Sequence, residues 1–177
     1  MDLESIKRLL EGEGEEHESP AVVDSMPLRF IEPLISHGLK IQIVQPDRLL
    51  CSFKVPPRIV EHSNGSLHDG VIAALVDVIG AAAVFVGGAP ATGVSVDINV
   101  SYVGAAYAGV RVSIYLQSAD SVIHHKKDEI EIDAKVLGIK NAIAVVSVEL
   151  RNTKTGKVIA QGRHSKYWGF QQLKSKI

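Results

Sequence analysis

A polar, turn-forming segment runs directly into a strongly apolar one, and side chains capable of chemistry lie on both. The polar segment, residues 64–70, contains His68 and ends at Gly70. The apolar segment, residues 71–85, has the composition of a buried helix and carries a single carboxylate, Asp77, among alanines and valines. Burying a lone carboxylate costs several kcal/mol, so chemistry or an interface must account for it. The pattern indicates an enzyme.

The start of such a helix and a carboxylate farther along it supply the two parts of a hydrolytic site. Free N–H groups around His68 to Gly70 would stabilise a developing oxyanion. Asp77 would either activate a water molecule or attack directly. At about 1.5 Å per residue, however, Asp77 lies roughly 12–13 Å from the start of its own helix. An antiparallel helix from a second copy would bring another Asp77 alongside, so the chemistry predicts a dimer with shared sites.

Composition places the chain among soluble globular proteins. With 177 residues, of which 46% are hydrophobic and 22% charged, the chain fits one domain with a sizeable core. A net charge of −1 argues against nucleic acid as the main partner. Cys51 is the only cysteine, which excludes an intrachain disulfide and suits a reducing compartment. Because Asp77 interrupts the longest apolar run, we expect no membrane span and no membrane partner.

The chain divides into three regions by composition. Residues 1–37 predict N-terminal helices and an acidic linker, and residues 38–170 predict the main domain. Residues 110–127 look like an insertion into that domain, and residues 171–177 form a C-terminal tail.

Alternating hydrophobicity predicts six strands. The alternation is strict over residues 93–102, where one face should meet a core and the other water or a polar site. Hairpin turns are expected at residues 138–141 and 152–156. The expected strands are residues 39–43, 49–55, 93–102, 128–136, 142–150 and 157–161. One apolar helix wrapped by a curved antiparallel sheet satisfies this order, which makes the fold class α+β and buries the helix on nearly every side.

Several motifs together resemble those of the hotdog-fold acyl-CoA thioesterases. They are the helix start at residues 65–70, the acid at Asp77, the Val-Ser-Val-Asp strand at 94–97 and the Ala-Gln-Gly-Arg-His segment at 160–164. The chain is most similar to the small phenylacetate-pathway-type branch, which includes small mitochondrial acyl-CoA thioesterases of animals and plant relatives. The resemblance covers about residues 38–109 and 128–168.

The resemblance implies hydrolysis of an acyl-CoA to a free acid and CoA by a homodimer or homotetramer. It implies no metal or redox cofactor, since coenzyme A is part of the substrate. The oxyanion donor would be the backbone N–H of Asp69, and the catalytic acid would be Asp77. Ser95 would support that acid, and Asn64 would position water or substrate.

Further residues are candidates for substrate binding. Gly70 lies at the helix start, and Arg163, His164 and Lys166 form a cluster that could meet the CoA phosphates or merely end an exposed strand.

Each candidate also has a purely structural explanation. His68 could hold the preceding turn by a hydrogen bond, a role we favour over proton transfer. Asp77 could be satisfied by backbone donors, Ser95 could be a strand serine facing solvent, and Asn64 a turn residue. The neighbouring His124 and His125 have no third ligand at a convincing spacing and predict a solvated loop. The alternative function is a non-catalytic hotdog module that binds acyl-CoA.

The sequence departs from the family pattern at two places. Asp69 stands where the family has a second glycine, and its negative charge beside a developing oxyanion would slow turnover or change the substrate set. Residues 110–127 are extra sequence that could add a strand or protrude as a loop. If this segment lay across the subunit interface, it would block assembly. The final Ser175, Lys176 and Ile177 resemble a peroxisomal address, so we expect a peroxisomal or otherwise cytoplasmic protein.

Overall fold

The structure is a computed structural model that describes residues 35, 37–108, 111–112, 123–124 and 129–169. The expected N-terminal helices and acidic linker, apart from Ile35 and His37, lie outside the described residues. So do most of the insertion and the whole tail with its Ser175, Lys176 and Ile177.

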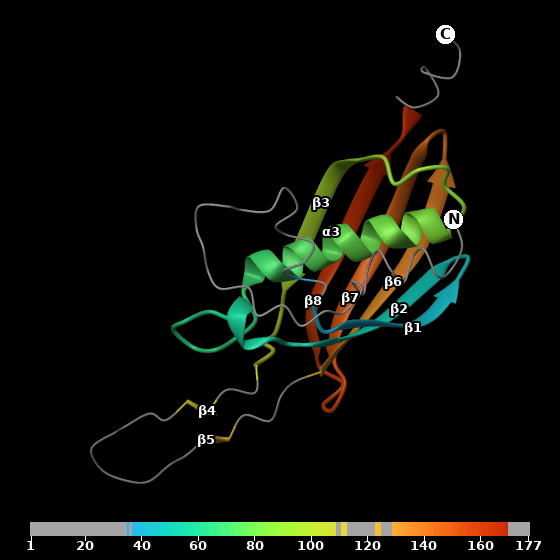
Figure 1. The fold of residues 1–177 in the computed structure, drawn as a ribbon. Helices are drawn as coiled ribbons and strands as arrows, with labels where there is room; N and C mark the ends of the chain where they lie inside the picture. The colour runs from blue at the N-terminus through green and yellow to red at the C-terminus, as the bar shows by residue number, and fades with distance from the viewer. Residues whose placement is uncertain (1–34, 36, 109–110, 113–122, 125–128, 170–177) are drawn as a thin grey trace, which may run out of the picture.

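The architecture is a long helix laid across one face of an antiparallel sheet (Figure 1). The helix is α3 (Asp69–Val86), preceded by a short 3₁₀ turn, η1 (Pro57–Ile59). The sheet has six strands in the order β1-β2-β6-β7-β8-β3. Its strands are β1 (Leu39–Gln45), β2 (Arg48–Lys54), β3 (Val94–Tyr102), β6 (Glu129–Lys140), β7 (Ile143–Asn152) and β8 (Val158–Tyr167). The predicted α+β arrangement is confirmed.

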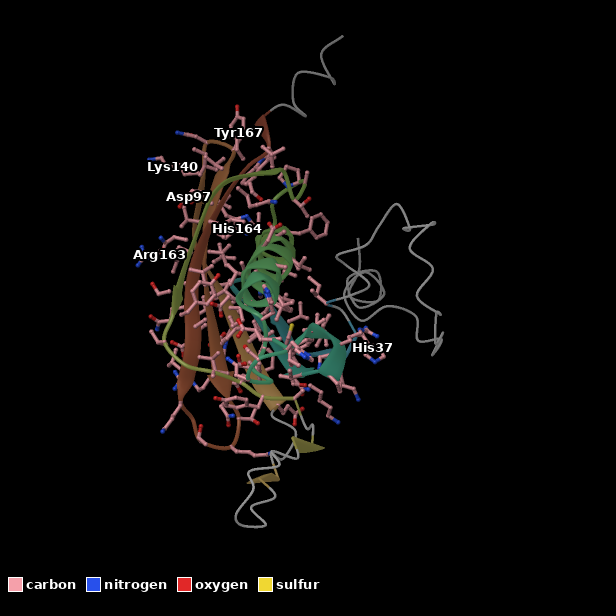
Figure 2. The ribbon with its side chains drawn as sticks, turned by 90° about the vertical axis from the view of Figure 1, so that its left-hand side faces the viewer. His37, Asp97, Lys140, Arg163, His164 and Tyr167 are labelled. Atoms are coloured by element: carbon pink, nitrogen blue, oxygen red, sulfur yellow. The ribbon has the colours of Figure 1, made fainter. Side chains whose placement is uncertain are left out.

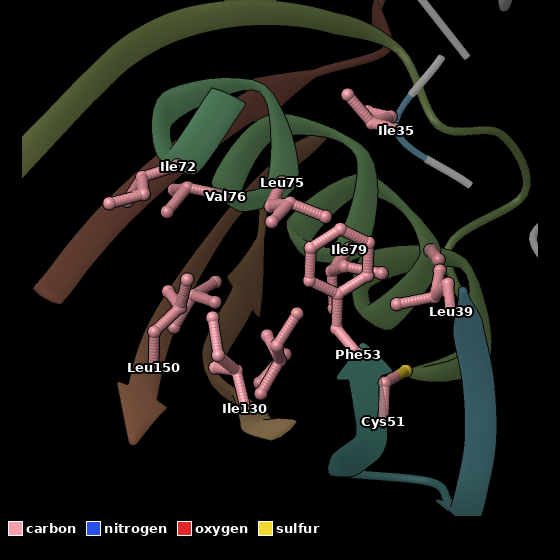
Figure 3. Close-up of a cluster of buried hydrophobic side chains, with 14 of the residues drawn as sticks. Ile35, Leu39, Cys51, Phe53, Ile72, Leu75, Val76, Ile79, Ile130 and Leu150 are labelled. Carbon is pink, nitrogen blue, oxygen red and sulfur yellow. The ribbon is translucent and has the colours of Figure 1, made fainter. Parts of the chain in front are cut away.

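The core lies between α3 and the sheet (Figure 3). Ile72, Leu75, Val76 and Ile79 recur at helical spacing on the face of α3 that meets the sheet, and all four are buried. The strands contribute large apolar side chains to the same core, among them Phe53, Ile130 and Leu150. Burying one such side chain stabilises a fold by about 1.5–3 kcal/mol, so this interface holds the helix in place.

One flank of α3 is less buried than the sequence analysis expected. This flank, beside β3 and β8, carries Asp77, whose side chain is 45% exposed. By length and composition alone α3 could cross a membrane, but it packs on the sheet as a core helix. Residues 71–86 of α3 are otherwise all buried or half-buried.

Two glycines let α3 approach β8 closely. A Cβ atom at Gly162 of β8 would lie 2.7 Å from Cγ1 of Val76, and one at Gly80 of α3 would lie 2.8 Å from Nδ1 of His164. Real Cβ atoms do not approach so closely. The crossing of α3 over β8 therefore depends on the missing side chains at both positions.

The expected strict alternation of β3 is wrong at one point. The register between β3 and β8 shifts between Ser95 and Asp97, as in a β-bulge. Ser95 then pairs with Lys166, and Ile98 pairs with His164. Since Lys166 and His164 are both buried, Ser95 and Ile98 both face the helix, although strict alternation would put them on opposite faces.

Two strands extend farther than the sequence indicated. The turn expected at residues 138–141 is formed by Asn141 and Ala142, with φ of 51° and 64°, so β6 continues to Lys140. The last strand does not end at residue 161 but runs to Tyr167. Within the expected insertion, β4 (Arg111–Val112) and β5 (Ile123–His124) pair with each other and not with the six-stranded sheet.

Replacing Gly162 with alanine should test the close crossing. We expect Gly162→Ala to lower the free energy of unfolding by about 1–3 kcal/mol, because the added methyl overpacks against Val76. Gly138→Ala is the matched control, since a Cβ atom there meets nothing within 4 Å. Denaturant unfolding at equal protein concentration measures both, and equal stabilities of the two variants would contradict this packing.

Candidate active site

His68 caps the start of α3. Its Nδ1 accepts a hydrogen bond from the Gly70 N–H at 3.0 Å, and its carbonyl accepts from the N–H groups of Val71 and Ile72. The sequence analysis expected His68 to hold the preceding turn, but it caps the following helix. The Asp69 N–H has no hydrogen-bond partner within the part of the chain that is described. Among the backbone N–H groups of the first helical turn, the Asp69 N–H is therefore the one available to a ligand.

The loop before the helix is held from two sides. The His68 N–H donates to the Ile59 carbonyl at 3.1 Å, and the Leu67 N–H donates to the Ala106 carbonyl at 2.7 Å. Both bonds fix where α3 begins, and with it the direction of the free N–H group.

Asn64 is a turn residue. Its Oδ1 accepts hydrogen bonds from the backbone N–H and the hydroxyl of Ser66, at 2.8 and 2.7 Å, and its Nδ2 donates to Glu61. All of these partners belong to its own turn, as in an Asx motif. The structural explanation thus accounts for the position of Asn64, and its expected role in positioning water or substrate stays a prediction.

A pocket of about 320 Å³ opens beside the helix start. His68 and Gly70 line it on the helix side, and Arg58 contributes the one cationic side chain among its lining residues. The other lining residues are apolar: Ile35, Ile59, Val60, Val71 and Ala74. The pocket therefore suits an apolar group whose polar end reaches the first turn of α3.

A second group of polar side chains gathers at the middle of α3. Asp77 from the helix, Ser95 from β3 and His164 from β8 meet there. The Ser95 hydroxyl donates to Asp77 Oδ1 at 3.1 Å and lies 3.0 Å from His164 Nε2. His164 Nε2 is 3.3 Å from the same carboxylate oxygen, and Lys166 Nζ donates to Ser95 Oγ at 3.2 Å. Three elements of the fold thus converge on one carboxylate.

Burial sets the charge of His164. The side chain is fully buried, and this desolvation lowers its pKa below the ordinary value, although the nearby Asp77 acts in the opposite direction. His164 is therefore neutral at pH 7. Nε2 lies 3.3 Å from Asp77 Oδ1 and 3.0 Å from Ser95 Oγ, so the proton belongs on Nε2, where these oxygens can accept it.

Two expectations about this group need correction. Asp77 is not a lone buried carboxylate, because it is half exposed and is bonded by Ser95. The expected cluster of Arg163, His164 and Lys166 is also divided between the two faces of the sheet. Arg163 and His164 point to opposite faces (Figure 2). His164 and Lys166 are buried on the helix side, whereas Arg163 lines a polar groove of about 330 Å³ on the other face. Binding of substrate by these residues stays a prediction.

The alternation of residues along β8 already indicates which of these side chains lie on each face of the sheet. Ala160, Gly162, His164 and Lys166 share one phase of β8, and all four are buried. Extending the last strand beyond residue 161 would have placed His164 and Lys166 on the helix side and Arg163 on the other. As for metals, no group of His, Cys, Asp and Glu in the described ranges is arranged to hold an ion.

Comparison with known proteins identifies the family. Residues 64–118 match the sequence model of the thioesterase superfamily. Human acyl-coenzyme A thioesterase 13 is 38% identical over 134 residues, which cover 73% of this chain and 81% of that protein. The chain belongs to the thioesterase superfamily. This thioesterase is therefore a thioester hydrolase, and the resemblance to small acyl-CoA thioesterases is confirmed.

Solved structures agree with the fold of this thioesterase. Zebrafish thioesterase superfamily member 2 superposes with a TM-score of 0.68 at 28% identity, covering 96% of this chain and 99% of that chain. Mouse thioesterase superfamily member 2 gives a TM-score of 0.62 at 33% identity, covering 77% of this chain and 86% of that one. The hotdog fold expected from the resemblance is confirmed.

The cap formed by His68 leads to a prediction that separates its two possible roles. His68→Ala should lower the free energy of unfolding by about 1 kcal/mol, because the Gly70 N–H loses its acceptor. His68→Asn should retain both stability and thioesterase activity, because asparagine is a good cap. Denaturant unfolding and thiol release measure the two effects. A stable but inactive His68→Asn variant would instead indicate proton transfer by His68.

Proposed function

We propose that this thioesterase hydrolyses acyl-CoA thioesters to a free acid and CoA in sites shared between two protomers. The start of α3 from one protomer would supply the oxyanion donor, and Asp77 of another would supply the acid. One observation carries the proposal: the free Asp69 N–H and the Asp77 carboxylate lie on one helix, about 12 Å apart at a rise of about 1.5 Å per residue. The curated relative, named for acyl-coenzyme A, supports the substrate class.

The proposed reaction uses water and needs no metal or redox cofactor. The thioester oxygen accepts the hydrogen bond of the Asp69 N–H, and the positive end of the α3 dipole favours the charge that develops on it. Asp77 either takes a proton from the attacking water or forms an acyl intermediate that water then hydrolyses. When the tetrahedral intermediate collapses, the C–S bond breaks, and the sulfur leaves as a thiolate that takes up a proton.

Strand β3 supports the shared site. It forms one edge of the six-stranded sheet, and its Val94 and Val96 are 53% and 65% exposed. An exposed apolar edge strand is a place where another chain pairs. Pairing of two β3 edges would continue the sheet across a homodimer and bring the two α3 helices together. A homotetramer would add further contacts to that dimer.

The pocket beside the helix start is the proposed acyl site. It lies against His68 and Gly70, so a thioester carbonyl at the Asp69 N–H would direct its acyl group into the pocket. The apolar lining by Ile59, Val60 and Val71 suits the hydrocarbon part of an acyl chain.

The alternative proposal is an acyl-CoA-binding module with weak or no hydrolysis, and Asp69 is the observation that favours it. Its side chain is exposed in the first turn of α3. A carboxylate stabilises a helix N-terminus, but beside an oxyanion it opposes the charge that forms there.

Replacing Asp77 tests the acid. Asp77→Asn keeps an oxygen that can accept from Ser95 but cannot serve as base or nucleophile. We expect kcat for thiol release from acyl-CoA to fall at least about 10²-fold. Asp47→Asn is the matched control, because Asp47 lies in the exposed turn between β1 and β2. Normal thiol release by folded Asp77→Asn protein would refute the assignment.

Replacing Asp69 tests the oxyanion donor. Asp69→Pro removes the N–H at the first helical position, which tolerates proline, and the extended backbone of His68 suits a following proline. We expect kcat to fall about 10²–10³-fold.

Asp69→Gly is the matched control at the same position, since it keeps the N–H and removes the carboxylate. It should hydrolyse acyl-CoA faster than the natural protein. If Asp69→Pro were as active as Asp69→Gly, the Asp69 N–H would not be the donor.

A further inference from the structure

Lys166 is a buried cation that the proposed reaction does not use. The residue is only 6% exposed, and its Nζ donates to Ser95 Oγ at 3.2 Å. Burying an ammonium group costs several kcal/mol unless it is paired and hydrogen-bonded. Ser95 and the nearby charge of Asp77 compensate it here. A lysine held at such cost beside the candidate acid requires an explanation.

The hydroxyl of Ser95 has one proton and two lone pairs to share among three neighbours. The ammonium of Lys166 can only donate, so it occupies one lone pair. The Nε2–H of neutral His164, 3.0 Å away, can occupy the other. The Ser95 proton then has one direction left, toward Asp77 Oδ1 at 3.1 Å.

We propose that Lys166 is a positioning residue that, acting through Ser95, fixes the direction of the hydrogen bond that Ser95 donates to Asp77. The inference rests on the proposed role of Asp77. Lys166 is buried and its ammonium group donates to Ser95, so we do not expect it to contact the substrate. Its effect should appear in kcat more than in KM.

The test measures kcat and KM for Lys166→Met, which preserves side-chain length and removes charge and donor. We expect kcat at pH 7 to fall about 10–100-fold, the range for a lost hydrogen bond of a charged group. KM should change little. Lys157→Met is the matched control, because Lys157 is an exposed lysine immediately before β8, and it should leave both constants unchanged.

A double-mutant cycle with Ser95→Ala tests whether Lys166 acts through Ser95. Ser95→Ala removes the bonded hydroxyl without changing Lys166, so it should by itself reproduce the loss of kcat, and adding Lys166→Met should cost nothing further. Should Lys166→Met fold poorly, an unchanged kcat of folded Ser95→Ala would overturn the inference. Unchanged kcat in folded Lys166→Met, or fully additive losses in the cycle, would also overturn it. If Asp77→Asn is inactive in the same assay, such a result refutes only the role of Lys166, whereas an active Asp77→Asn refutes the proposed function itself.

Discussion

The close crossing of α3 over β8 is the constraint on which the candidate site depends. Gly80 and Gly162 allow the helix to lie so near the strand that no Cβ atom fits between them. This distance brings the Asp77 carboxylate within 3.3 Å of His164 Nε2 and lets Ser95, on the neighbouring strand, bond to it. A helix held one side chain farther away would separate the Asp77 carboxylate from both Ser95 and His164.

In the proposed reaction one helix carries both the oxyanion donor and the acid, and a straight helix cannot bring its own start to its middle. Within the described residues, the His68 cap uses the Gly70 N–H and leaves the Asp69 N–H without a partner. Asp77 lies about two turns away, on the flank of α3 beside β3. This separation is the reason that the proposed site needs a second protomer.

The fold was largely predictable from the sequence because its signals are local. Alternating residues marked the six strands, and one apolar run marked α3. The site was harder, because its geometry depends on contacts between strands. The bulge after Ser95 turns that side chain toward the helix, which no alternation rule reveals. The positive φ of Asn141 and Ala142 extends β6 past the glycine that looked like the turn. The partial exposure of Asp77 depends on how α3 packs on the sheet, which the helical pattern alone does not reveal.

Co-expression of two inactive variants tests the shared site most directly. Protomers carrying Asp77→Asn and protomers carrying Asp69→Pro, each with a different tag, would be purified together as mixed oligomers. One site in such a pair combines an intact helix start with an intact acid from the other chain. The account predicts that mixed oligomers release thiol from acyl-CoA although neither parent does. Mixed oligomers as inactive as both parents would contradict it.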